Sequence, residues 1–204
     1  MAQFLNIHPD NPQERLINSV VMILRNSGVL IYPTDSCYAL GCRVGEKEAV
    51  DRIRNIRQLA PNHNMTLVCR DLSEIASYAK VGNTAYRLMK SLTPGPYTFL
   101  LRATRDVPRR LQHPRRKTIG LRIPDNHIAL SLLENLGEAM MSTSLILPGE
   151  DNPMTELEDI KQLLGGDVDL IIDGGPCGIE PTTVIDLVED EPVVVRQGKG
   201  KPRI

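Results

Sequence analysis

Hydrophobic positions along the chain follow two patterns that alternate. Apolar residues recur at helical spacing in six segments: 12–27, 49–56, 71–79, 84–92, 128–136 and 156–164. Short apolar runs rich in strand-forming residues lie between and after them: 29–32, 65–69, 97–101, 118–123, 139–142, 169–172, 182–187 and 193–196. Alternating helices and strands predict an α/β fold, a twisted sheet flanked by helices. Because no helix separates the last strands, we expect the sheet to be mixed.

Local signals and length predict a single domain. Asn11 can cap the first helix with Pro12 at its first position, and Gly28 ends that helix. Segments rich in Pro and Gly are short enough to be loops, and neither a repeat nor a low-complexity linker interrupts the chain. The 204 residues therefore predict one domain, 1–204, with its core at about 15–198.

Composition indicates a globular protein of a reducing compartment. Hydrophobic residues make up 41% of the chain and charged residues 24%, and the apolar runs are far shorter than the roughly 20 residues of a membrane span. The four cysteines form no C-x-x-C pair, which is typical of reduced thiols. We expect a soluble cytoplasmic protein with no membrane partner. With 3% aromatic residues and no tryptophan, an aromatic platform for stacked bases is unfavoured.

The net charge of −1 hides two strongly charged stretches. Residues 102–122 hold eight basic side chains and one acidic side chain, whereas residues 150–191 hold thirteen acidic and one basic. The first stretch is a candidate surface for an anion such as RNA. Its candidate RNA-binding residues are Arg109, Arg110, Arg115, Arg116 and Lys117. The alternative is that the two stretches fold together and neutralise each other, or are ordinary solvated faces.

Common signatures of nucleotide and metal sites are absent from the sequence. Neither the P-loop, G-x-x-x-x-G-K-[ST], nor the dinucleotide fingerprint, G-x-G-x-x-G, occurs. The histidines are scattered, so we expect no metal site built from protein side chains. A thiol nucleophile, Cys37 or Cys69 with His63, is conceivable, but inert buried thiols are far commoner. These patterns identify no catalytic residue.

Hydroxyl and cationic side chains collect at the predicted ends of strands, where ligands bind in open α/β sheets. Arg122 stands between apolar residues of its strand, and a buried arginine needs an anionic partner or a route to solvent. Arg57 closes a predicted helix, where it could simply complement the helix dipole. The other members of the set are Thr34, Thr98, Ser144, Thr182 and Arg196.

Six short sequence blocks occur in order along the chain. They are Ile31-Tyr32-Pro33-Thr34-Asp35-Ser36 with Tyr38-Ala39-Leu40-Gly41, Thr93-Pro94-Gly95-Pro96-Tyr97-Thr98, Gly120-Leu121-Arg122-Ile123-Pro124, Ser142-Thr143-Ser144, Pro181-Thr182-Thr183-Val184-Ile185-Asp186 and Val195-Arg196-Gln197-Gly198. Together they resemble the YrdC/YciO-like family. The resemblance implies that family's twisted mixed sheet and a basic concave surface suited to nucleotides or double-stranded RNA. The best-known members of the family are threonylcarbamoyl-AMP synthases, which act in the t6A modification of tRNA.

The resemblance also implies a ligand pocket. Matched residue by residue, the positions that would contact the nucleotide or its phosphates are Arg57, Thr98, Arg122, Ser144 and Arg196. The positions that would line a pocket for a threonine-like ligand are Thr34, Thr66 and Thr182. Among all of these, Arg122 and Arg196 are the expected anion contacts.

This chain departs from the family pattern at two paired motifs. The family's Lys-x-Arg pair aligns with Arg57-Gln58-Leu59, and its Ser-x-Asn pair aligns with Ser144-Leu145-Ile146. Leu59 cannot bind phosphate, and Ile146 lacks an amide. Losing one cation and one polar clamp commonly costs a phosphoryl-transfer site on the order of 3 to 5 kcal/mol. These departures are similar to those of the YciO branch.

Three functions are therefore open. The first is a YciO-type protein that binds ATP or AMP, and double-stranded RNA, tRNA or rRNA, with no more than weak threonylcarbamoyl-AMP synthesis. The second is a genuine synthase that uses L-threonine, bicarbonate and ATP, with Mg²⁺ on the nucleotide. The third is a non-catalytic protein that binds RNA or the ribosome through the basic stretch. Strongly salt-dependent binding would mark the third, because phosphate contacts release counterions.

Overall fold

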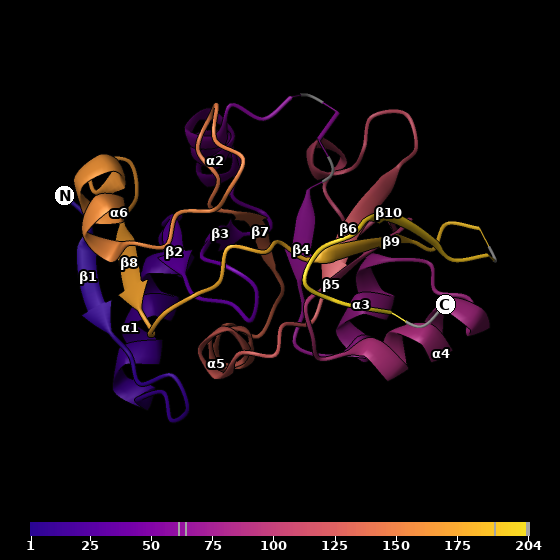
Figure 1. Ribbon diagram of the computed structural model, residues 1–204, viewed down its shortest axis with the longest axis horizontal. Coiled ribbons are helices and arrows are strands. Elements are labelled where there is room, and N and C mark those ends of the chain that lie inside the picture. The colour runs from indigo at the N-terminus through magenta and orange to yellow at the C-terminus, as the bar shows by residue number, and fades with distance from the viewer. Residues whose placement is uncertain (61, 64, 190, 203–204) are drawn as a thin grey trace.

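One mixed sheet organises the molecule. The computed structural model describes residues 1–60, 62–63, 65–189 and 191–202, and in this part of the chain the 10-stranded sheet has the order β1-β8-β2-β3-β7-β4-β6-β5-β9-β10 (Figure 1). The strands are β1 (Gln3–Asn6), β2 (Leu30–Tyr32), β3 (Ala39–Arg43), β4 (Thr66–Val68), β5 (Tyr97–Arg102), β6 (Thr118–Arg122), β7 (Met140–Ser144), β8 (Leu170–Asp173), β9 (Thr183–Asp186) and β10 (Val193–Arg196). The antiparallel β9 and β10 close one edge. The predicted mixed α/β sheet is confirmed.

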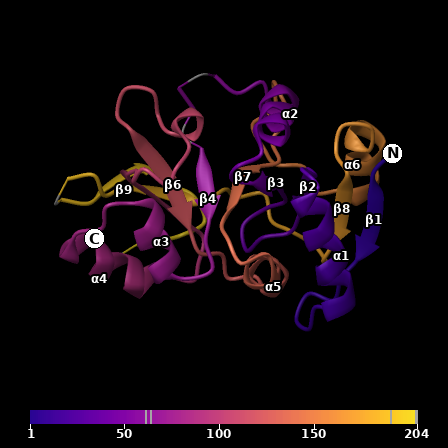
Figure 2. The same ribbon diagram turned by 180° about the vertical axis from the view of Figure 1, so that it is seen from behind.

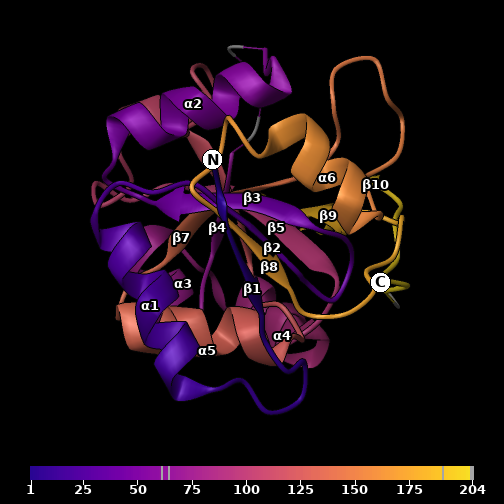
Figure 3. The same ribbon diagram turned by 90° about the vertical axis from the view of Figure 1, so that its left-hand side faces the viewer.

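Helices cover both faces of this sheet. They are α1 (Glu14–Arg25), α2 (Lys47–Arg57), α3 (Leu72–Tyr78), α4 (Asn83–Leu92), α5 (His127–Leu136) and α6 (Leu157–Leu164), with a short 3₁₀ turn, η1 (Arg109–Leu111). In α1 the buried stripe is Ile17, Val20, Val21 and Leu24, the spacing that turns one face of a helix to a core. Figure 3 shows α1 and α5 on one side of the sheet and α2 and α6 on the other, while α3 and α4 lie together beside β6 when the molecule is seen from behind (Figure 2). Within the described residues, none of the helices combines the length and apolarity that crossing a bilayer requires.

The predicted elements are all present, and their ends lie within two residues of the predicted ends. The start of the first helix is corrected, because α1 begins at Glu14 and follows Gln13, which makes no side-chain cap. The preceding loop uses His8 instead, whose Nδ1 accepts from the backbone amide groups of Asp10 and Asn11. Asn11 is therefore part of a turn before the helix and does not cap it.

Two strands have no counterpart in the sequence prediction. The edge strand β1 is largely exposed and, among the described residues, pairs with β8 alone, so it carries no apolar run. The strand β3 contains Gly41, which is usually a strand breaker. Here the glycine is required, because a Cβ at Gly41 would stand 2.8 Å from the ring of Tyr32 on the neighbouring strand. Close packing against an aromatic ring overrides the local propensity.

Burial suppresses the reactivity of two of the thiols. Cys37, Cys42 and Cys69 are buried free cysteines. Burial raises the pKa of Cys42 to about 12 and raises that of Cys69 well above its ordinary value. Because the thiolate is the nucleophilic form, neither position favours thiol chemistry, and Cys69 is a poor candidate nucleophile.

Candidate functional site

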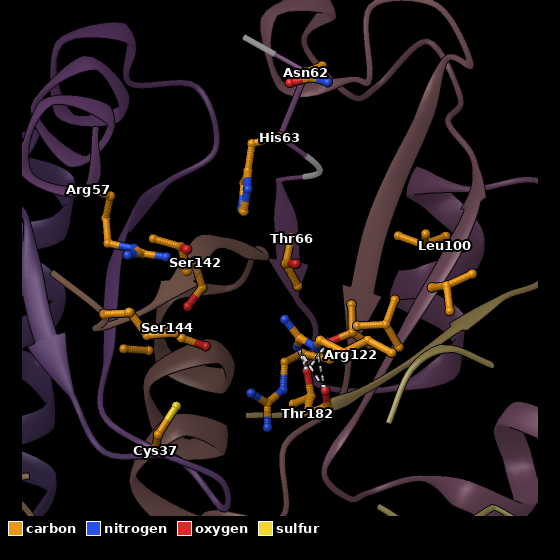
Figure 4. Close-up of a pocket in the computed structure, with 17 residues that line it drawn as sticks. Cys37, Arg57, Asn62, His63, Thr66, Leu100, Arg122, Ser142, Ser144 and Thr182 are labelled. Atoms are coloured by element: carbon orange, nitrogen blue, oxygen red, sulfur yellow. Dashed lines mark hydrogen bonds between the residues drawn. The ribbon is translucent and has the colours of Figure 1, made fainter. Parts of the chain in front are cut away.

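A pocket of about 360 Å³ opens among the strands from β3 to β10, and Figure 4 shows it closely. It is lined by Cys37, Ala39, Arg57, Asn62, His63, Thr66, Thr98, Leu100, Arg122, Ser142, Thr143, Ser144, Ile146, Thr182, Val184, Val195 and Arg196. Of the residues predicted to bind a nucleotide or a threonine-like ligand, the fold brings together Arg57, Thr66, Thr98, Arg122, Ser144, Thr182 and Arg196. Only Thr34 among the predicted ligand contacts lies outside this lining.

Strand register explains why these distant residues meet. Ser142 of β7 is the register partner of Thr66 of β4, Thr66 that of Gly120 of β6, and Gly120 that of Leu100 of β5. Register partners lie side by side on one face of a sheet, so this row forms part of the pocket floor. Gly120 keeps the floor open, because a Cβ there would stand 2.8 Å from the Oγ1 of Thr66.

Thr34 builds the turn that precedes the pocket. Its Oγ1 donates to the carbonyl of Cys37 at 2.6 Å and accepts from the backbone amides of Ser36 and Cys37, each at 3.2 Å. One donor and two acceptor positions are all that a hydroxyl offers, so none remains for a ligand. The resemblance implies a ligand contact for Thr34, whereas the structure gives it the side-chain-to-backbone bonds of a turn residue.

Two threonines and Arg196 form one wall of the pocket. The Oγ1 atoms of Thr98 and Thr182 are hydrogen-bonded at 2.8 Å, which joins β5 to the start of β9. The Arg196 side chain donates to the carbonyl of Thr182 from Nη2 at 2.8 Å and from Nε at 3.2 Å. A neutral carbonyl orients the guanidinium without cancelling its charge, and within the described residues no carboxylate pairs with it.

The charge of Arg122, at the end of β6, is compensated by a carboxylate, whereas that of Arg196 is not. Its Nη2 forms an ion pair with Asp35, and both side chains are only 8% exposed. Its Nη1 donates to the Oγ of Ser36 at 3.3 Å, while its buried Nε finds no acceptor within the described residues. The turn that Thr34 organises therefore supplies the counter-charge for Arg122.

Arg57 enters from the last turn of α2 and has no counter-charge in the part of the chain that the structure describes. Its buried Nε also lacks an acceptor within the described residues. Burial lowers the pKa of Arg57, and likewise that of Arg196, from the ordinary value of arginine. Such a desolvated, unpartnered guanidinium is attracted to any anion that enters the pocket.

Asn62 and His63 are lining residues that the sequence analysis did not assign to a ligand site. They lie in the irregular loop after α2, where no periodic pattern indicates which side chains face inward. Burial lowers the pKa of His63, and the nearby Arg57, Arg54 and Arg196 lower it further. The one signal that could have indicated them as pocket residues is their position in the sequence, a few residues after the motif that begins with Arg57.

The two family departures have different structural outcomes. Leu59 packs against the hydrophobic core and does not line the pocket. Ile146 does line it, so an apolar side chain stands where the family pattern has an amide. One departure therefore removes a cation from the pocket, and the other makes its wall more apolar.

Cys37 and His63 both line the pocket, but they do not form a nucleophile and base pair. Figure 4 shows them at opposite ends of the cavity. The thiol of Cys37 instead accepts from the Oγ of Ser36 at 3.9 Å. A thiol mechanism of the kind considered from the sequence is not supported by this placement.

The donor set of the pocket is poorly suited to a resident divalent metal. Mg²⁺ prefers carboxylate oxygens, water and phosphate oxygens. Within the described residues no carboxylate lines the pocket, and its charged side chains are arginines. These side chains therefore attract phosphate and do not fit a metal ion directly.

Apart from Arg122, the basic side chains of residues 102–122 lie outside the pocket, and they are partly neutralised. All five predicted RNA-binding residues, Arg109, Arg110, Arg115, Arg116 and Lys117, are exposed, and none lines the pocket. Two ion pairs tie this stretch to the acidic one: Arg116 with Asp186 at 2.6 Å, and Arg102 with Glu189 at 2.8 Å. The acidic and basic stretches therefore meet in space at two points.

The chain matches known proteins over nearly its whole length. Residues 22–198 match the Sua5_yciO_yrdC family model, described as "Telomere recombination". The uncharacterized protein YciO of Escherichia coli K12 is 60% identical over 98% of this chain and 97% of its own. The crystal structure of E. coli YciO superposes with a TM-score of 0.96, at 59% identity and covering 98% of each chain.

Relatives with a named activity are more distant. The threonylcarbamoyl-AMP synthase of Nitrosococcus oceani is 33% identical over 74% of this chain and 82% of its own. The crystal structure of P. abyssi Sua5 complexed with L-threonine has a TM-score of 0.87 at 27% identity, covering 96% of this chain and 57% of that one. The fold thus occurs in a protein whose crystal structure contains L-threonine.

Proposed function

The chain belongs to the Sua5/YciO/YrdC family, and from this premise we propose that its pocket binds the phosphate end of an adenine nucleotide, ATP or AMP. The observation that carries this proposal is the pair of uncompensated arginines, Arg57 and Arg196, in a pocket without a lining carboxylate among the described residues. A partly desolvated cation without a counter-charge attracts anions, and a bound phosphate would satisfy it by charge-assisted hydrogen bonds. Arg122 lines the same pocket and adds a third guanidinium, although its charge is paired with Asp35.

Threonine is the proposed second ligand of this pocket. The hydroxyls of Thr66 and Ser144 face the cavity and make no hydrogen bond within the described part of the chain. The relative of known structure that holds L-threonine shares this fold. Because Leu59 is turned away and Ile146 brings no amide, we expect threonylcarbamoyl-AMP synthesis from L-threonine, bicarbonate and ATP to be weak. In that reaction Mg²⁺ would enter with the triphosphate, since the pocket offers it no carboxylate.

Binding of AMP tests the nucleotide site directly. We expect Arg57→Ala and Arg196→Ala each to weaken AMP binding about 10- to 100-fold, the loss of a charge-assisted hydrogen bond. Calorimetric titration would measure this, with Arg109→Ala as the matched control because that arginine is exposed and outside the pocket. Equal AMP affinity in all four proteins would refute the proposal.

Turnover tests the weaker activity. The purified protein is supplied with ATP, and pyrophosphate is measured with threonine and bicarbonate each present or omitted. We expect slow release that needs both substrates, and faster release in the double variant Leu59→Arg/Ile146→Asn. Release at a full synthase rate by the unmodified chain would show that Arg57 alone suffices on the phosphate.

RNA binding by the basic stretch is a second candidate function, favoured by one observation. Arg105, Arg109, Arg115 and Lys117 are exposed and form no ion pair within the described residues. Phosphates of double-stranded RNA or tRNA would meet such side chains across the A-form backbone. The two ion pairs to the acidic stretch reduce the charge available, so we expect modest affinity that falls steeply with salt.

A further inference from the structure

The loop after α2 carries a histidine into the pocket. His63 is partly buried and lines the cavity with Arg57 and Arg196. Its backbone N–H donates to the carbonyl of Ala60 at 3.0 Å, which holds this part of the loop in a turn. In Figure 4 the imidazole points into the cavity, between Arg57 and Thr66. The side chain is therefore placed to reach an anion that the arginines attract.

The charges around this imidazole are positive. The titratable groups that face it or share its cavity are Arg54 and Arg57 of α2, Cys37, Arg122 of β6 and Arg196 of β10. Arg122 is paired with Asp35, and within the described residues no carboxylate lines the pocket. Burial together with these arginines lowers the pKa of His63, so the empty pocket favours the neutral imidazole.

We propose that His63 takes up a proton when the pocket binds a phosphate-type dianion, and that it then acts as a third cation beside Arg57 and Arg196. The inference rests on the proposed nucleotide function and deepens it, because it favours a dianionic group, such as the phosphate of AMP, over a monoanionic carboxylate. A permanent cation would have to stay buried among arginines in the empty pocket. A histidine avoids that repulsion and becomes charged only when the anion reverses the local potential.

The sign of the pH dependence follows from this exchange. The arginines hold the pKa of the empty-pocket imidazole down, whereas a dianion beside it raises that pKa. Between the two values, binding consumes a proton, so affinity rises as the pH falls, by up to about tenfold for each pH unit. Above the pKa of the complex the imidazole stays neutral and the affinity no longer changes.

Sulfate is the probe of choice because it remains a dianion from pH 8 to pH 5.5, whereas the phosphate of AMP titrates near pH 6. Calorimetric titrations in two buffers of different ionisation enthalpy count the protons taken up. The variants are His63→Gln, which stays neutral, and His63→Lys, which stays charged. His127→Gln is the matched control, since His127 is exposed at the start of α5 and outside the pocket. The ¹⁵N shifts of the imidazole, with and without sulfate, give the titration of His63 itself.

We expect the unmodified chain and His127→Gln to bind sulfate more tightly at low pH with proton uptake. His63→Gln should lose both effects, and His63→Lys should bind at the low-pH level throughout. The same pH slope in His63→Gln and the unmodified chain would overturn the inference alone, provided that AMP still binds. Absence of both AMP and sulfate binding at every pH would overturn the proposed function and the inference with it.

Discussion

Two groups of arginines differ in what surrounds them. In the pocket, Arg57 is half-buried and Arg196 is exposed, and within the described residues neither has a counter-charge. On the basic stretch, Arg102 and Arg116 are exposed and paired with acidic side chains. The second group stands out in the sequence because basic residues are dense between positions 102 and 122. Anion binding is expected to be more favourable at the first group, because a bound anion would supply the counter-charge that Arg57 and Arg196 lack.

Arg122 is the informative intermediate between these groups. It lines the pocket like Arg57 and Arg196, yet it is buried and carries a carboxylate partner, as the surface arginines do. Its pairing with Asp35 is therefore expected to stabilise the fold, whereas Arg57 and Arg196 are available to a ligand. Substitutions at these arginines and their partners should therefore separate effects on stability from effects on binding.

The largest expected effect is on the buried ion pair. Asp35→Asn leaves Arg122 charged, buried and uncompensated, so we expect the free energy of unfolding to fall by about 3 kcal/mol. Glu189→Gln removes the partner of Arg102 from a pair whose side chains are 55% and 79% exposed, and we expect a change near zero. Urea denaturation of both variants measures the difference. Equal losses would mean that burial does not distinguish the two pairs.

The next largest effect should separate Thr34 from Thr66, two residues that the resemblance assigns to one ligand pocket. One substitution should lower stability and the other should lower ligand affinity. Thr34→Val leaves the carbonyl of Cys37 and two backbone amides unsatisfied, and we expect a loss of about 2 kcal/mol in stability with AMP affinity unchanged. Thr66→Val removes a hydroxyl that faces the cavity, so stability should hold while ligand affinity falls. Denaturation measures the stability of both variants, and calorimetry measures their affinity for AMP. A loss of AMP binding in a folded Thr34→Val protein would show that Thr34 contacts the ligand and would contradict this prediction.

The unpartnered arginine gives a smaller effect of opposite sign. Arg57→Met replaces a desolvated guanidinium by an apolar side chain of similar length, so we expect the empty protein to gain about 1 kcal/mol of stability while AMP binding is lost. Arg109→Met, on the surface, should change neither. Thermal unfolding with and without AMP measures both effects. A destabilised Arg57→Met protein would show that the guanidinium has a structural partner.

Periodicity predicted most of the fold, and particular contacts explain the exceptions. The strand β3 was missed because Gly41 is selected by the ring of Tyr32, a contact that local propensity does not contain. The edge strand β1 was missed because exposure on its free side leaves no apolar run to detect. In both cases the determining neighbour comes from another strand.

The candidate site was predictable in part for a similar reason. The resemblance named seven of the lining residues, because strand ends carry the family's blocks. It could not show that Arg122 is paired, since Asp35 lies 87 residues away in sequence. It also passed over His63, because an irregular loop has no period that reveals which side chains turn inward. Charge compensation and loop orientation are properties of the folded chain.

The smallest expected effect lies on the basic stretch, where pairing should lower the contribution of a cation to RNA binding. Each phosphate contact contributes about 0.9 to the slope of log affinity against log salt on B-form DNA, and A-form RNA is expected to be comparable. Arg115→Ala should flatten the slope by about that amount, since Arg115 is exposed and has no ion pair within the described residues. Arg116→Ala should flatten it by less, because Arg116 must first leave Asp186, a partner at 2.6 Å. Filter binding of a double-stranded RNA at several salt concentrations measures both slopes, with Asp186→Asn as the control that frees Arg116. If Arg116→Ala and Arg115→Ala change the slope equally, the acidic stretch does not mask the basic one, and the surface group would be as available to a polyanion as the pocket is to a phosphate.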